Sequence, residues 1–351
     1  MVDKLDYFWK KKTLLSFIAV IFVIIIHNSA TGQYNISTDF FTTLTYNYRN
    51  IIAYGLGSIA VPLFFFLSGF TMFRNYTLKH YPSKLKTRAK SLLLPYLIWN
   101  IISLLFIILC TYTPLANYIS GREIFTPSTN NILEGIFLYK YNFQFWFLYD
   151  LIIYTLLTPL TYFLIKNKYL GALSSIIILF LPTLFTSLLH LNLNFTIFYF
   201  LGCYCGKHYL NLFALPSSKK TVSLSCLLFF IFLILKILLN FGILSPPSIL
   251  PNIILIGLLF SFWFFSDCFI QKLQPKKYTA ETFPIYTLHT YFLAAIIKTI
   301  YLLGPKTTSM LFFNEIISSL LTVIIVTLIA YYWHKKLPRI YSFMFGAKTS
   351  S

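Results

Sequence analysis

The residues best able to do chemistry in this sequence are a few ionisable side chains within long apolar runs. His27 ends the run FIAVIFVIIIHN, and Asp150 lies in FWFLYDLIIY. Placing an ionisable residue inside a bilayer is costly, so each one is a candidate functional residue. A positioned imidazole can act as a general base, and a neighbouring carboxylate can orient it and raise its basicity. We therefore predict His27 and Asp150 as catalytic; the alternative is that both only reach toward water or a neighbouring helix.

Helical geometry gives these two residues a similar depth. At the rise of an α-helix, His27 lies roughly 21 Å beyond Thr13, in the outer half of the membrane. Asp150 lies about six residues below the outer end of its own segment. Asn28 and Ser29 follow His27 and are expected to share a hydrogen-bond network with it.

His289 is a third candidate, in TFPIYTLHTYF near the inner end of its segment, with Tyr286 one turn earlier on the same face. The favoured interpretation for His289 is an interhelical hydrogen bond. The remaining histidines lie in loops or at segment ends and join no motif: His80, His190, His208 and His334. The five cysteines, at spacings that fit neither a disulfide framework nor a zinc site, are interpreted as small apolar residues, and no metal site is expected: Cys110, Cys203, Cys205, Cys226 and Cys268.

A basic cluster precedes the third apolar segment and comprises Arg74, Lys79, Lys84, Lys86, Arg88 and Lys90. Such a cluster can bind the phosphates of a nucleotide-like molecule, and Arg is best suited to bidentate contacts. The alternative is that these charges only mark the cytoplasmic side. The sequence contains no GxGxxG, Walker A, GxSxG or HExxH motif, which argues against soluble hydrolase and ATPase classes.

The elements that must position these residues are membrane helices. Hydrophobic residues make up 58% of the chain and charged residues 11%, with a mean hydropathy of +0.74, whereas soluble domains are typically about a quarter charged. The net charge of +19 does not indicate a nucleic-acid partner, because the 28 Lys and Arg residues lie in short loops between apolar segments. Residues 1–351 are therefore predicted to form a single polytopic membrane domain in the lipid bilayer, without a soluble domain.

The expected fold class is all-α integral membrane, with about ten transmembrane helices of which the sixth is short. A helix that crosses the bilayer needs roughly 20 mostly apolar residues. The segments are 13–30, 51–73, 91–111, 145–165, 169–189, 195–208, 222–240, 249–266, 283–303 and 316–333. The first is interpreted as a retained helix, not a cleaved signal peptide, and the largest outer loop is about 112–144.

The distribution of charge predicts the orientation. Of the 28 Lys and Arg residues, 22 lie before the first segment, after the even-numbered segments or in the tail. Such a bias predicts a cytoplasmic N-terminus and C-terminus. No pair of matching broken helices, which is typical of inverted-repeat transporters, is evident.

Four stretches, in order, resemble proteins of acyltransferase family 3, integral membrane enzymes that O-acylate bacterial surface carbohydrates. These are the first apolar segment ending in His27, VPLFFFLSGF at 61–70, RAKSLLLPYLIW at 88–99, and the pair FWFLYDLIIY at 145–154 and TFPIYTLH at 282–289. The motif-supporting residues within them are Ser68, Tyr96, Trp146, Tyr286 and His289.

The resemblance implies acyl transfer from cytoplasmic acyl-CoA, usually acetyl-CoA, as the donor substrate, with no permanently bound cofactor. His27 matches the first-helix histidine of the family, with the role of general base. Arg88 matches an arginine of the Arg-x-x-Arg motif, and with Lys84, Lys86 and Lys90 it is expected to bind acyl-CoA. Two serines, Ser16 and Ser91, stand where members commonly carry basic residues, so this chain either holds the donor differently or has changed function.

The resulting hypothesis is a membrane O-acyltransferase, most simply an O-acetyltransferase, of the bacterial inner membrane. Its acceptor would be a lipid-linked or nascent cell-envelope polysaccharide, and glycan-synthesis proteins are possible partners. Larger relatives carry an added esterase-like domain, which is not expected in this sequence. The acceptor is therefore expected to be modified at the membrane, or the acyl group to be passed to a partner. The alternatives are an exporter or flippase of such a glycan, and a membrane scaffold without enzymatic activity.

Overall fold

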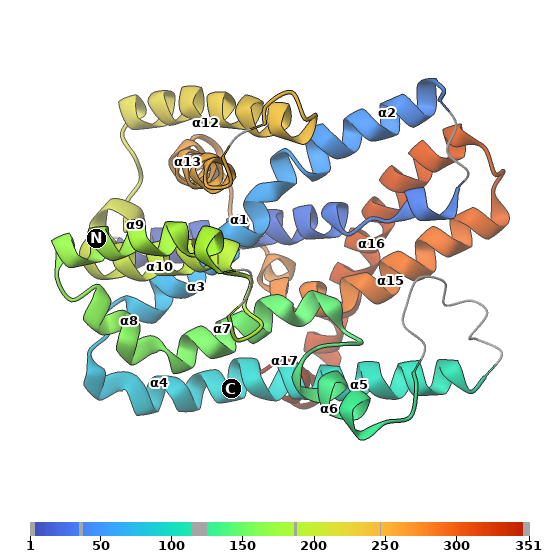
Figure 1. Cartoon of the computed structure of the whole chain (residues 1–351), viewed down its shortest axis with the longest axis horizontal. Helices are drawn as coiled ribbons and strands as arrows, with labels where there is room; N and C mark the ends of the chain where they lie inside the picture. Colours follow the sequence, from blue (N-terminus) through green and yellow to red (C-terminus); the bar gives the residue numbers. More distant parts are fainter. Residues whose placement is uncertain (1–3, 35–37, 114–124, 186–187, 246, 347–351) are drawn as a thin grey trace. The chain divides into compact units, whose positions relative to one another are not determined.

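The computed structural model describes residues 4–34, 38–113, 125–185, 188–245 and 247–346, and in this part of the chain it consists of helices without a strand (Figure 1). The chain divides into two compact units that interleave in the sequence. Unit 1 comprises Met1–Asn75, Asn167–Thr186 and Leu193–Tyr332, and unit 2 comprises Tyr76–Lys166, Ser187–Asn192 and Trp333–Ser351.

Unit 1 holds the first helix and the last long helices. Its α-helices are α1 (Lys4–Ile26), α2 (Phe40–Tyr48), α3 (Ala60–Phe73), α9 (Lys168–Leu184), α10 (Leu193–His208), α11 (Leu210–Ala214), α12 (Lys219–Asn240), α13 (Leu250–Phe265), α14 (Asp267–Ile270), α15 (Thr282–Leu303) and α16 (Thr308–Lys336). Between α2 and α3 the backbone stays helical through a π-helical turn, Arg49–Ala53, and a 3₁₀ turn, Leu56–Ile59. The helical path that carries the predicted second segment therefore begins at Phe40, before residue 51.

Helices α3 and α10 pack closely because glycines line their contact. A Cβ atom added at Gly69 would collide with the Tyr199 carbonyl oxygen and lie 2.9 Å from the Cys203 nitrogen. Added at Gly202 or Gly206 of α10, it would meet the backbone of α3. Small residues spaced four apart let membrane helices approach to backbone contact, where dispersion replaces the missing hydrophobic driving force. The sulfur of Cys203 is buried in this contact, as expected of a small apolar residue.

The N-terminal half of α1 is fixed by a buried ion pair. Lys11 Nζ lies 2.5 Å from Asp267 Oδ1, and both side chains are almost fully buried. The same carboxylate accepts hydrogen bonds from the Tyr7 hydroxyl and the Ser217 backbone nitrogen. The Lys11 ammonium also lies 4.4 Å from the centre of the Trp263 ring. Because a buried charge is tolerated only when it is paired and hydrogen-bonded, this cluster holds α1 against α14 and the chain before α12.

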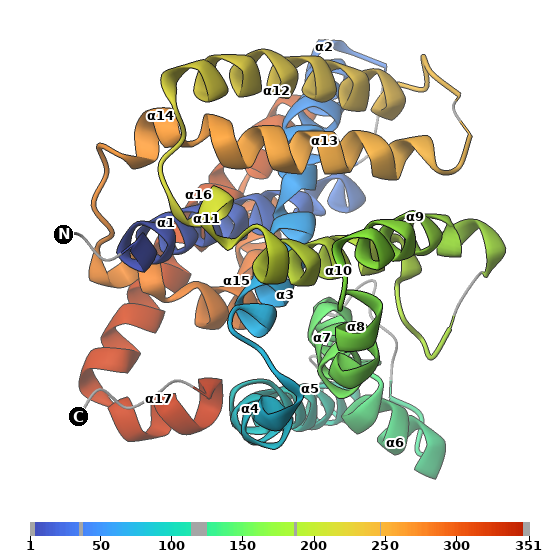
Figure 2. The ribbon, with the colours of Figure 1, turned by 90° about the vertical axis from the view of Figure 1, so that its left-hand side faces the viewer.

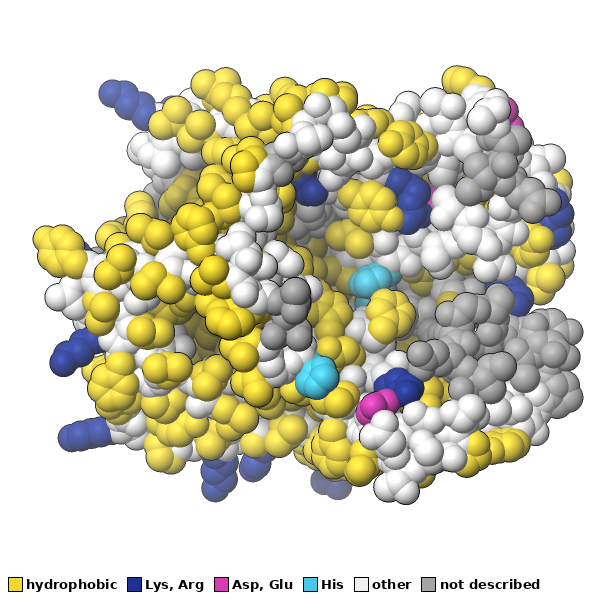
Figure 3. Space-filling view, viewed as in Figure 1, with side chains coloured by type: hydrophobic (Ala, Val, Ile, Leu, Met, Phe, Trp, Pro, Cys, Tyr) yellow, Lys and Arg dark blue, Asp and Glu magenta, His cyan; other side chains and the backbone are white. Residues whose placement is uncertain are grey.

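Helices α12 and α13 lie side by side as an antiparallel pair (Figure 2). Phe229 stacks on Phe265 at 5.3 Å between ring centres, and the Phe232 ring lies against Gly257. The outer face of α12 exposes many large apolar side chains, including Leu224, Leu227, Phe230 and Ile234. Such a face is suited to lipid, and Figure 3 shows hydrophobic side chains covering broad areas of the molecular surface.

Unit 2 contains α4 (Tyr81–Arg88), α5 (Leu94–Thr111), α6 (Thr129–Phe137), α7 (Trp146–Leu156), α8 (Thr158–Leu164) and α17 (Pro338–Phe345). A π-helical turn, Ala89–Leu93, joins α4 to α5. The C-terminal helix α17 packs on α5, where the Trp99 indole nitrogen donates to the Met344 carbonyl oxygen at 3.0 Å and the Trp99 ring stacks on Phe345. Residues 114–124 of the predicted outer loop lie outside the described residues, and α6 forms part of the remainder.

Among the described residues, seven helical segments are long and apolar enough to cross a membrane: Leu5–Gln33, Phe40–Phe73, Leu78–Thr111, Lys219–Asn240, Leu250–Ile270, Thr282–Leu303 and Thr308–Lys336. An eighth candidate is the pair Phe143–Leu156 and Thr158–Leu164, which is bent by 67° at Pro159. A proline removes a backbone donor and crowds the preceding turn, which explains the bend. Each of the ten expected segments contains helix, but α9 and α10, at 17 and 16 residues, are too short to count by length. The count of ten and the cytoplasmic position of both ends remain predictions.

The orientation predicts which loops an external reagent can reach. In a variant without the exposed Cys268, Asn130→Cys at α6 should react with a membrane-impermeant maleimide in intact cells, whereas Lys84→Cys in α4 should react only after the cells are opened. Labelling of position 84 in intact cells would reverse the assigned orientation.

Candidate active site

His27 lies at the point where α1 ends. The helix stops at Ile26, and the His27 backbone nitrogen donates to the Val23 carbonyl oxygen as the last α-helical bond. The final carbonyl groups of a helix carry a partial negative charge, which favours a cation beside them. A histidine that gains a proton at this position is therefore stabilised by the helix that carries it.

The structure brings His27 beside His289 of α15. The two ring centres are 5.3 Å apart, with the ring planes inclined by 42°. His289 is completely buried, and its Nδ1 lies 2.5 Å from the Tyr286 carbonyl oxygen, one turn earlier in the same helix. The hydrogen bond of His289 therefore runs to its own backbone, not to another helix as the sequence suggested.

This contact corrects the predicted depths of the two histidines. The sequence placed His27 in the outer half of the membrane and His289 near the inner end of its segment, yet their rings lie at one level. The reason is the place along α1 at which α15 begins. Tyr278, just before α15, already packs on Phe17 of α1, with 5.8 Å between ring centres. The chain after α14 thus runs along α1 before the new helix begins, and a count from loop boundaries cannot show this.

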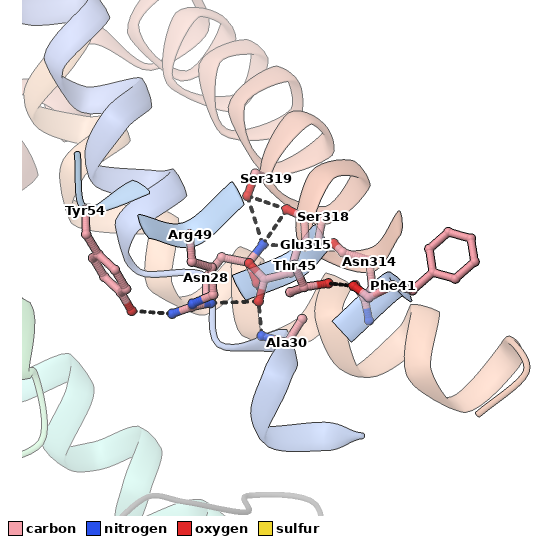
Figure 4. A network of polar contacts seen from close by, with 10 residues as sticks. All are labelled: Asn28, Ala30, Phe41, Thr45, Arg49, Tyr54, Asn314, Glu315, Ser318 and Ser319. Carbon is pink, nitrogen blue, oxygen red and sulfur yellow. Dashed lines mark hydrogen bonds and ion pairs between the residues drawn. The ribbon is translucent and has the colours of Figure 1, made fainter. Parts of the chain in front are cut away.

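Asn28 joins the end of α1 to α16, as Figure 4 shows. Its side-chain nitrogen lies within 2.9 Å of the Glu315 carbonyl oxygen and the hydroxyls of Ser318 and Ser319. Its side-chain oxygen accepts from the Ala30 backbone nitrogen. Asn28 thus lies in a hydrogen-bond network that fixes the residue after His27. That the side chains of His27 and Ser29 share this network remains a prediction.

An ion pair completes this network. Arg49, in the π-helical turn after α2, donates through Nη1 to the Asn28 carbonyl oxygen and to Glu315 Oε1, both at 2.7 Å. Its Nη2 donates to the Tyr54 hydroxyl at 2.5 Å. The Glu315 side chain is 1% exposed and that of Arg49 16%. One guanidinium therefore holds the end of α1, the start of α16 and the turn before α3 together.

Sequence reasoning missed Arg49 and Glu315 as site residues. Arg49 lies just before the expected segment 51–73 and Glu315 one residue before the expected segment 316–333, so neither falls inside a predicted helix. The available signal was their rarity, because only nine Asp and Glu residues occur in the chain and an acid at the edge of an apolar run requires a partner.

Asp150 of α7 belongs to unit 2, whereas His27 belongs to unit 1. The Asp150 side chain is completely buried. Its Oδ2 accepts from the Asn192 backbone nitrogen at 3.3 Å, and Oδ1 has no hydrogen-bond partner among the described residues. The carboxylate thus contacts the backbone of the turn before α10, and its pairing with His27 remains a prediction.

The remaining motif residues lie in α5 and α7 of unit 2 and in α3 and α15 of unit 1. Tyr96 is buried and donates from its hydroxyl to the Phe137 carbonyl oxygen at 2.7 Å, and its ring stacks on Phe145. Trp146 begins α7 and is half-buried. In unit 1, Ser68 is half-buried in α3, and Tyr286 is buried beside His289 with 6.0 Å between ring centres.

The basic residues of α4 and of the π-helical turn after it differ in solvent exposure. Lys84 and Arg88 are half-buried and lie four residues apart, whereas Lys86 and Lys90 are exposed. Side chains four apart share a helix face, so Lys84 and Arg88 present two cations together. Ser91 lies against Gly346, where a Cβ atom would come within 2.6 Å of the Ser91 Cα. Gly346, directly after α17, thus packs against the position at which the family motif would carry its second arginine.

Among the described residues, no three His, Cys, Asp or Glu side chains are grouped so that they could hold a metal ion. Fold and site together define a multi-pass helical membrane protein in which a histidine at the end of the first helix lies beside a second histidine. A family model described as an acyltransferase domain matches residues 13–333. The chain therefore belongs to acyltransferase family 3, which confirms the resemblance seen in the sequence and makes it a membrane acyltransferase. Comparison with curated proteins and with solved structures gave no match.

The ion pair predicts a non-additive pair of substitutions. Arg49→Leu leaves a buried carboxylate without its cation and should lower the free energy of unfolding by about 3–5 kcal/mol. Adding Glu315→Gln removes that charge, so the double variant should be more stable than Arg49→Leu alone. Thermal unfolding of the purified protein in detergent measures both.

The exposed pair Lys140 and Glu134 in unit 2 is the control. Their side chains are 2.7 Å apart but 25% and 32% exposed, and the hydrogen bond from Lys140 lowers the pKa of Glu134. Lys140→Leu should change the unfolding temperature little, because solvent screens an exposed pair. Equal losses of stability in Arg49→Leu and Lys140→Leu would show that Arg49 does not fix the end of α1.

Proposed function

We propose that this protein is an O-acetyltransferase of the bacterial inner membrane that moves the acetyl group of cytoplasmic acetyl-CoA to a hydroxyl of a cell-envelope or secreted polysaccharide. The observation that carries the proposal is His27 at the end of α1, beside His289, in a chain of acyltransferase family 3. A sugar hydroxyl is a weak nucleophile at neutral pH, so the transfer requires a positioned base.

In the proposed reaction, neutral His27 removes the proton of the acceptor hydroxyl as its oxygen attacks the thioester carbonyl carbon. The carbon–sulfur bond of the tetrahedral intermediate then breaks, the acetyl ester remains on the sugar, and the imidazolium returns its proton to the CoA thiolate. The last carbonyl groups of α1 stabilise that imidazolium. The Asn28 network holds the backbone that carries the ring.

We assign the binding of the acetyl-CoA phosphates to the basic residues of α4. Lys84 and Arg88 share a helix face, and Arg88 offers the planar fork that matches phosphate oxygens. Lys86 and Lys90 add to the local positive potential at the start of α5. With Ser91 in place of a second arginine, this chain would hold the phosphates through lysines, which act as point charges.

Asp150 is proposed as an orienting carboxylate for His27, from its predicted depth and its burial. If the two act together, the double variant His27→Ala/Asp150→Asn should be little worse than His27→Ala, because coupled residues are not additive. Wild-type acetylation by Asp150→Asn would reduce Asp150 to a structural polar residue.

His27→Ala should lower the rate of acetylation by about 10² to 10⁴, the contribution of a positioned general base. Mass spectrometry of surface glycan from cells that express wild-type protein, His27→Ala or no protein should show the acetyl mass only with the wild type. The glycan itself should reach the surface in all three. Unmodified glycan retained inside cells without the protein would favour an exporter or flippase, and full acetylation by His27→Ala would contradict the mechanism.

Arg88→Ala should raise the KM for acetyl-CoA by more than Lys79→Ala, because Arg88 lies on the face shared with Lys84 and Lys79 lies in the exposed 3₁₀ turn before α4. A loss of one charge-assisted phosphate contact corresponds to a roughly tenfold increase. Initial rates at varied acetyl-CoA with purified protein give the comparison. Small and equal effects would mean that the loop only orients the protein.

A further inference from the structure

We propose that His289 is a positioning residue for His27: its Nε2 accepts a hydrogen bond from a ring N–H of His27 and so fixes the tautomer in which the other nitrogen of His27 faces the acceptor hydroxyl. This inference rests on the proposed function and assigns to His289, in place of Asp150, the hydrogen bond that orients the ring of His27. It uses residues of unit 1 only.

The protonation of His289 follows from its partner. A backbone carbonyl oxygen can only accept, so the 2.5 Å contact between Nδ1 and the Tyr286 oxygen requires a proton on Nδ1. In the neutral ring, Nε2 then carries a lone pair and can only accept. This atom is buried and has no hydrogen-bond partner among the described residues. An unsatisfied buried acceptor costs free energy, which argues for a function that uses it.

The separation of the rings suits such a bond. A ring nitrogen lies roughly 1.2 Å from its ring centre, so two imidazoles joined by an N–H···N bond of about 2.9 Å have centres about 5 Å apart. The observed 5.3 Å is close to this value. His27 is half-buried at the end of α1, so its ring can also face an acceptor. Catalytic hydrogen bonds are often long without substrate and tighten in the complex.

Packing alone does not explain a histidine at this position. His289 lies in α15 between Leu288 and Thr290 and is surrounded by buried side chains. A leucine would fill similar space without leaving a polar atom unsatisfied. The imidazole is therefore better explained by its neighbour His27 than by the core.

Two substitutions distinguish the loss of the Nε2 hydrogen-bond acceptor from a change in side-chain volume. His289→Leu removes the Nε2 acceptor, whereas the amide oxygen of His289→Gln can reach the same position and accept. We expect His289→Leu to lower kcat for acetylation by about 10- to 100-fold with little change in KM for acetyl-CoA, and His289→Gln to recover most of that loss. His208→Gln, at the far end of α10, is the control and should leave the rate unchanged.

Nitrogen NMR of protein labelled with ¹⁵N-histidine gives a readout that does not depend on activity. The signals of His27, assigned by their loss in His27→Gln, should show one neutral tautomer in the wild type and a mixture in His289→Leu. A wild type that fails to acetylate glycan would overturn the proposed function and leave this test intact. Unchanged His27 signals in His289→Leu, or a Gln variant as slow as the Leu variant, would overturn the role of His289.

Discussion

The ion pair between Arg49 and Glu315 is the interaction on which the arrangement of the site depends. It is nearly buried, and its guanidinium also bonds the carbonyl of Asn28. A charge in this environment is tolerated only with its partner in place, so the pair permits few alternative arrangements of α1, α16 and the turn before α3. His27 immediately precedes Asn28 in the chain. The Arg49–Glu315 pair that fixes Asn28 therefore also limits where the His27 backbone can lie.

The first helix is fixed at both ends by different chemistry. Near its start, Lys11 and Asp267 form a buried pair supported by Tyr7, and at its end Asn28 bonds α16. Between these points α1 passes α3, which is itself packed against α10 through glycines. Because packing and hydrogen bonds replace the hydrophobic effect inside a bilayer, such anchors are the means by which a membrane protein holds a catalytic side chain still.

Much of the fold and part of the site could be predicted from the sequence. Apolar runs located the helices that carry His27, Asp150 and His289, and the cost of an ionisable residue in a membrane marked His27 as a candidate. They did not locate α4, because its basic residues read as a loop. The contact of His27 with His289 could not be predicted, because α15 begins beside Phe17 and no spacing reveals that the preceding chain runs along α1. The ion pair of Arg49 with Glu315 could not be predicted either, because a count of charges by loop does not show which of them contacts a buried carboxylate.

The central claim is that this protein transfers an acetyl group and that His27 drives the transfer. The most direct test is to reconstitute purified protein in liposomes with acetyl-CoA labelled in its acetyl group and with glycan extracted from cells that lack the gene. We expect the label to appear on the glycan as a base-labile ester with the wild type and to be absent with His27→Ala. Unlabelled glycan with the wild type, together with protein-dependent movement of that glycan across the liposome membrane, would contradict the account.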